Sequence, residues 1–74
     1  MELALLDVLS EAVKTRQRKE ELERSVGRAL RRREMDFKFY VQMMSELREV
    51  ARSDEISLDD AAKKLLSQNE KGDQ

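Results

Sequence analysis

The sequence contains no cysteine, histidine, proline or tryptophan, and only two of its 74 residues are glycine. Without cysteine the chain has no disulfides, and without cysteine or histidine it lacks the side chains that most metal sites and acid–base catalysts use. Its serines have no histidine to act as a base, and no glycine-rich phosphate loop occurs. These absences predict a protein that is not an enzyme and that binds neither metal nor cofactor.

Long apolar runs are lacking as well. The best candidate, Leu3 to Leu9, is interrupted by Asp7 and is far shorter than the roughly 20 residues needed to span a bilayer. It also lacks the basic flank that precedes the apolar part of a signal peptide. We therefore expect a cytoplasmic protein without membrane association.

Charged residues are abundant instead, at 42% of the chain against 4% for aromatic residues, which is typical of solvated helices rather than sheets. The net charge of −1 conceals an uneven distribution. Residues 1–13 have a net charge of −3, residues 14–33 contain nine bases and three acids, and residues 34–74 have a net charge of −4. The middle of the chain is therefore a basic block between acidic ends.

Apolar residues recur at helical spacing along most of the chain. A first stripe covers residues 3–13 and disappears in the polar run 14–21, which is either a solvated helical span or a loop. A second stripe extends from Leu22 to Ala51 with the three-four alternation of a coiled-coil seam. The pattern predicts a mainly α protein in which residues 2–52 form one long helix or a helix pair. A single helix of this span would be about 75 Å long, so it must fold back or pair with another chain.

A separate C-terminal helix is indicated by Ser57, which is followed by an apolar residue and two acids. A serine N-cap accepts a hydrogen bond from a free backbone amide, and acids in the first turn complement the helix dipole. A short helix is therefore predicted from about residue 58 to residue 68. Residues 1–68 are expected to form a single helical domain, followed by a disordered polar tail over residues 69–74.

Self-association is the expected source of additional stability. A chain this short buries only about 60% of its unfolded surface, and no disulfide or metal can compensate. The second stripe also has no stretch of equal length to pack against within the chain. We therefore predict a homodimer or higher homo-oligomer that binds a protein partner as a small regulator or adaptor. The residues expected to carry self-association and partner binding are Leu22, Val26, Leu30, Phe37, Tyr40, Val41, Met44 and Leu47.

The segment from Met35 to Met43 has two periodicities at once, because its apolar residues fit a helix but also alternate as in a half-buried strand. The alternating residues are followed by a helical apolar pattern that includes Leu47 and by the Ser57 cap. In this order of features, residues 34–68 resemble the ribbon-helix-helix family of small dimeric DNA-binding repressors. The resemblance implies an alternative fold, a ribbon-helix-helix dimer with a helical N-terminal extension and a strand at 35–39.

The alternative function is accordingly that of a DNA-binding regulator that uses the basic segment 14–33 and the possible strand. Clusters of basic side chains bind phosphates by releasing counterions. However, Glu34 and Asp36 adjoin the same arginines and would face DNA phosphates unfavourably, so protein binding ranks first. The candidate nucleic-acid contacts are Arg28, Arg31, Arg32, Arg33 and Lys38.

Overall fold

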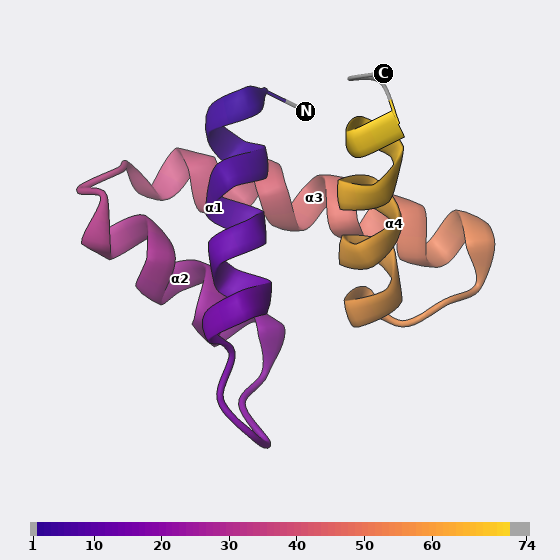
Figure 1. Cartoon of the computed structure of the whole chain (residues 1–74), viewed down its shortest axis with the longest axis horizontal. Helices are drawn as coiled ribbons and strands as arrows, with labels where there is room; N and C mark the ends of the chain where they lie inside the picture. Colours follow the sequence, from indigo (N-terminus) through magenta and orange to yellow (C-terminus); the bar gives the residue numbers. More distant parts are fainter. Residues whose placement is uncertain (1, 72–74) are drawn as a thin grey trace.

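The computed structural model describes the backbone of residues 2–71 and the side chains of residues 2–68. Within this range the chain contains no strand and forms four helices. They are α1 (Leu3–Thr15), α2 (Leu22–Arg32), α3 (Phe37–Asp54) and α4 (Leu58–Lys71). The helices α1 and α4 lie side by side, and α3 crosses behind both (Figure 1). The prediction of a mainly helical protein is confirmed.

All four helices contribute to one hydrophobic core. Its fully covered residues are Leu5, Val8, Leu9 and Ala12 of α1, Leu22, Val26, Ala29 and Leu30 of α2, Met43, Met44 and Leu47 of α3, and Ala61 and Ala62 of α4. Each large aliphatic side chain buried in this way stabilises the fold by roughly 1.5–3 kcal/mol. Ser25 is also fully buried, and its hydroxyl donates a hydrogen bond to the carbonyl of Ala12, which satisfies this polar group and ties α2 to α1.

Residues 2–52 do not form the one long helix or the helix pair expected from the sequence, and the seam from Leu22 to Ala51 is not continuous. The chain leaves the helical conformation after Thr15 and again after Arg32, so this part of the sequence forms three helices. The polar run 14–21 therefore contains a loop, which was one of the two options left open by the sequence. Because the chain reverses twice, the second stripe packs against other helices of the same chain. The expectation that this stripe lacks an intramolecular partner is also wrong.

A capped turn stands where the alternative fold would have a strand. Glu34 has a left-handed backbone with φ of 54°. Its N–H donates to the carbonyl of Arg31 over 3.0 Å, and the N–H of Met35 donates to the carbonyl of Leu30 over 3.1 Å. These two bonds form the Schellman motif that ends a helix. Phe37 then begins α3, because helical amides are satisfied within the segment whereas a lone strand has no neighbour to pair with. The strand at 35–39 is therefore absent from the described residues.

The turn between α3 and α4 repeats this arrangement. Glu55 has φ of 55°, and the N–H of Ile56 donates to the carbonyl of Ala51 over 2.9 Å. The hydroxyl of Ser57 then accepts a hydrogen bond from the N–H of Asp60 at 3.1 Å, so the predicted N-cap is confirmed. The backbone of α4 continues to Lys71, into the segment expected to be a tail, and residues 72–74 lie outside the described residues.

Candidate binding groove between α2 and α3

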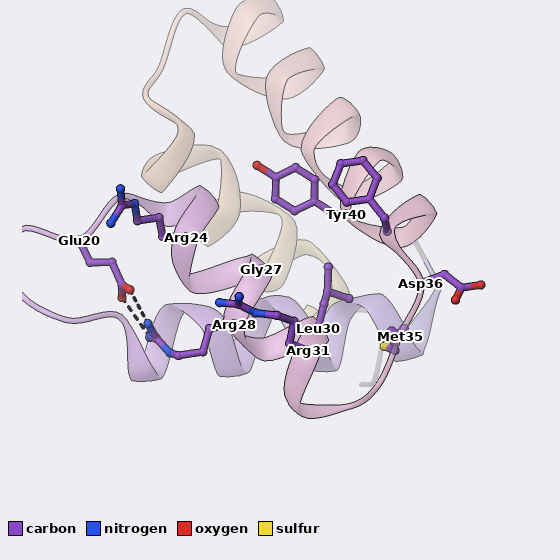
Figure 2. Close-up of a pocket in the computed structure, with 10 residues that line it drawn as sticks. Glu20, Arg24, Gly27, Arg28, Leu30, Arg31, Met35, Asp36 and Tyr40 are labelled. Carbon is purple, nitrogen blue, oxygen red and sulfur yellow. Dashed lines mark hydrogen bonds and ion pairs between the residues drawn. The ribbon is translucent and has the colours of Figure 1, made fainter.

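An open groove of about 590 Å³ lies between the outer face of α2 and the beginning of α3 (Figure 2). This volume falls within the range of about 300–1,000 Å³ that is usual for binding pockets. Leu30 and Met35 provide its apolar base. The groove exists because the capped turn after α2 directs α3 across the end of α2.

The α2 wall of the groove is formed by Arg24, Arg28 and Arg31, with Gly27 between them. Residues three and four positions apart lie on the same face of a helix, so the three guanidinium groups emerge on one side of α2. A Cβ atom added to Gly27 would meet nothing within 4 Å. The missing side chain of Gly27 therefore keeps the space between the arginines open.

The α3 wall is aromatic. The rings of Phe37 and Tyr40 are stacked, with centroids 5.3 Å apart and planes inclined by 24°. Phe37 is 74% exposed, and Val41 on the next turn is 53% exposed. We call Phe37, Tyr40 and Val41 the α3 aromatic surface. Single exposed apolar residues are common on proteins, but adjoining ones mark surfaces that bind other molecules.

A second groove, of about 610 Å³, extends the same surface along α3. It begins at Tyr40, which both grooves share, and continues past Met44 to the basic side chains of Arg48 and Arg52. Arg52 is paired with Glu49 at 2.7 Å, so this end of the surface carries less free charge than the α2 wall. The two grooves therefore adjoin along α3, and the exposed apolar surface lies at the beginning of the helix, from Phe37 to Val41.

Arg28 is neutralised within the chain. Its guanidinium group forms a two-point ion pair with Glu20, with one Nη2–Oε1 distance of 3.0 Å, and also donates to the carbonyl of Thr15 over 3.0 Å (Figure 2). The hydrogen bond between the two side chains lowers the pKa of Glu20 and raises that of Arg28. This pair fastens the loop before α2 to the helix, so Arg28 supports the wall and offers little free charge.

The other two arginines of the wall are exposed, and neither Arg24 nor Arg31 has an ion-pair partner in the described part of the chain. The remaining acid at the groove, Asp36, lies at the opposite end and points away from the arginines (Figure 2). An unpaired arginine binds a carboxylate through two parallel hydrogen bonds. The groove therefore combines two exposed arginines, for which the described residues provide no ion-pair partner, with a partly exposed aromatic wall.

The residues predicted for self-association divide into two sets. Five of the eight are buried among the chain's own helices, which corrects their assignment as a self-association surface, although Leu30 and Met44 still line the two grooves; they are Leu22, Val26, Leu30, Met44 and Leu47. The other three are the residues of the α3 aromatic surface. The sequence pattern identified the apolar positions, but it did not indicate which of them stay exposed.

The predicted nucleic-acid contacts do not form one patch of free charge. Arg28 pairs with Glu20, while Arg32 and Arg33 both approach Glu11, at 3.6 and 3.0 Å. Lys38 lies with its Nζ 5.3 Å from the centre of the Phe39 ring. Of the five candidates, only Arg31 faces the groove without a partner in the described residues.

The sequence interpretation missed the groove itself. Arg24 was recognised only as part of the basic block, and Gly27 was not predicted to open a space beside it. The spacing of Arg24, Gly27, Arg28 and Arg31 along one helical face was a usable signal. However, it becomes informative only when the aromatic residues of α3 are known to lie opposite.

Among the described residues, no helix is long and apolar enough to cross a membrane, and no three carboxylates gather where they could hold a metal ion. No protein-family model, no curated protein and no solved structure matches the chain.

Proposed function

We propose that this protein is a non-enzymatic interaction module, a small regulator or adaptor, that binds an acidic and apolar segment of a partner protein in the α2–α3 groove. One observation carries the proposal. The guanidinium groups of Arg24 and Arg31, which have no ion-pair partner among the described residues, stand opposite the stacked rings of the exposed Phe37 and the half-buried Tyr40.

The chemistry of the two walls of the groove suits a peptide better than a small polar metabolite. Arginine and aromatic residues are enriched among the side chains that dominate binding energy at protein interfaces. Covering the Phe37 ring would remove apolar area from water, at about 25 cal/mol per Å². A carboxylate beside it would satisfy Arg24 or Arg31. A ligand with one apolar side chain next to an Asp or Glu therefore fits both halves of the groove.

Nucleic-acid binding is less well supported. Phosphate contacts by Arg28, Arg32 and Arg33 would require ion pairs with the chain's own carboxylates to break. A ligand that must first break internal ion pairs binds more weakly by the free energy of those pairs. An acidic peptide makes no such demand, because Arg24 and Arg31 have no ion-pair partner within the described part of the chain.

The proposal can be tested without knowing the partner by selecting ligands from a random-peptide display library on the immobilised protein. The selected peptides are expected to contain Asp or Glu close to Leu, Phe or another large apolar residue. They should bind Gly27→Ala much as they bind the original protein, because a methyl group fits the open space. They should lose binding to Gly27→Glu, whose carboxylate would occupy the groove and pair with its arginines.

Duplex DNA and a basic version of the best peptide, with Lys in place of each acid, serve as competitors at physiological salt. Neither should displace the selected peptide. Selection of basic peptides, retention of binding by Gly27→Glu, or displacement by duplex DNA would each contradict the proposal. The last outcome would favour the nucleic-acid alternative.

A further inference from the structure

The N-terminal turn of α1 has the chemistry that the groove is proposed to recognise. Leu3 is 80% exposed and is the one exposed large apolar residue in the described chain outside the α3 aromatic surface. Glu2 and Asp7 beside it are exposed and have no ion-pair partner among the described residues. We call Glu2, Leu3 and Asp7 the acidic tip.

The tip and the groove are complementary in charge and in polarity. Leu3 and Asp7 are four residues apart on one helix and therefore lie on the same face, with Glu2 directly before them. The tip thus presents one apolar side chain between two carboxylates. The groove presents an aromatic wall opposite the guanidinium groups of Arg24 and Arg31, for which no described residue provides an ion-pair partner.

The tip does not occupy the groove of its own chain, because Leu3 remains exposed and does not line the groove. We propose that the acidic tip of one copy docks in the α2–α3 groove of a second copy. This inference rests on the proposed function and makes the tip a competitor of the partner segment. Self-association would then keep the groove covered until a partner displaces the tip.

The contact joins two different surfaces, so it is head-to-tail in kind. Such a contact forms a closed dimer if two copies dock reciprocally, and otherwise a ring or a chain of copies. One apolar anchor in a shallow groove covers less than the roughly 1,200 Å² of a standard stable interface. The expected behaviour is a weak, concentration-dependent association that weakens further with salt, because its charges are exposed.

Two variants separate the tip from the groove. Leu3→Asp removes the apolar anchor, and it should fold normally because Leu3 is exposed and an acid is favourable in the first turn of a helix. Gly27→Glu blocks the groove. Its Cβ atom would meet nothing within 4 Å, and the substitution replaces a poor helix former with a good one, so the variant should fold. Circular dichroism should show the same helix content for both variants as for the original chain.

Association is measured by sedimentation velocity at concentrations up to about 1 mM, where weak complexes become populated. Any purification tag is placed at the C-terminus so that it does not cover the acidic tip. The original protein should sediment faster as concentration rises, and each variant alone should associate about tenfold more weakly or not at all. An equimolar mixture of Leu3→Asp and Gly27→Glu should regain a one-to-one complex, since it contains one intact tip and one intact groove. Gly27→Ala should behave as the original chain does.

A protein that stays monomeric throughout this range overturns the inference. So does an association that Leu3→Asp leaves intact, or a mixture of the two variants that does not form a complex. Loss of association in Val41→Asp but not in Leu3→Asp would assign the contact to paired α3 aromatic surfaces instead. If selected acidic peptides still bind the groove in any of these cases, the proposed function stands and only the tip has been misassigned.

Discussion

The apolar stripe between Leu22 and Ala51 has a buried part and an exposed part. The two parts have similar composition but different environments. Met43 and Leu47 are buried by α3's neighbours, whereas Phe37 and Val41 on the same helix are largely exposed. At about 100° per residue, the exposed pair lies about 120° around the helix axis from the buried pair. The stripe is therefore wider than the contact that the rest of the chain makes with α3. Its uncovered part is available to another molecule.

The largest expected effect on stability comes from placing a carboxylate in the buried part of the stripe. The same change in the exposed part is the comparison. Leu47→Asp should unfold the protein, because a carboxylate buried without a partner costs several kcal/mol, a large share of the stability of a small domain. Val41→Asp should leave the thermal midpoint nearly unchanged, since a charge at that position remains in water. Thermal denaturation followed by circular dichroism measures both. Similar midpoints for the two variants would contradict the division of the stripe.

An intermediate effect on the free energy of unfolding is expected at the N-cap of α4, the helix that covers the buried part of the stripe on α3. Ser57→Ala removes the hydroxyl that accepts from the N–H of Asp60 and should lower the free energy of unfolding by about 1 kcal/mol. Urea denaturation measures this change in the free energy of unfolding. Ser57→Asp is the matched control and should retain most of the stability, because Asp is also a good N-cap.

A smaller effect on stability, of opposite sign, is expected at the turn between α2 and α3. Glu34→Gly should raise the free energy of unfolding by about 0.5 kcal/mol, because relief of left-handed strain is partly offset by the greater entropy of the unfolded chain. The same substitution at the exposed helical residue Glu49 should destabilise the protein by about 1 kcal/mol. If both substitutions destabilise equally, the backbone of Glu34 is not left-handed in solution.

The smallest effect is expected from the ion pairs at the α1–α2 loop, since these groups are partly exposed and screened by salt. The hydrogen bond from Arg28 lowers the pKa of Glu20 below its ordinary value of 4.5, and that from Arg16 lowers the pKa of Asp59 below 3.8. Carboxyls with a lowered folded-state pKa stabilise the fold above their unfolded pKa. This contribution is lost as the pH falls through the folded pKa.

The thermal midpoint should therefore fall as the pH is lowered from about 5 to 3. In Glu20→Gln, which cannot ionise at this position, the fall should be shallower. The control is Glu21→Gln, which removes an exposed acid for which the structure records no side-chain partner. Equal acid dependence in the two variants would show that the pair between Glu20 and Arg28 does not affect stability.

The local features of the fold could be predicted where a residue type acts on its own neighbours. Ser57 indicated the beginning of α4 because its hydroxyl caps an amide three residues away. The turns at Glu34 and Glu55 could not be predicted in the same way. A left-handed residue is usually glycine, and here the strain at two glutamates is offset by the packing of the helices that the turns connect.

By itself, the amino-acid sequence determined the helical character of the chain and the apolar positions on each helix, because both depend on spacing within a few residues. Only the tertiary structure decided which of those positions face the core. That choice depends on where the chain reverses, and the reversals bring together residues far apart in the sequence. The pairing of Arg28 with Glu20, the freedom of Arg24 and Arg31, and the placement of Phe37 opposite Gly27 arise in this way. The groove is therefore a property of the packed helices and of no single segment.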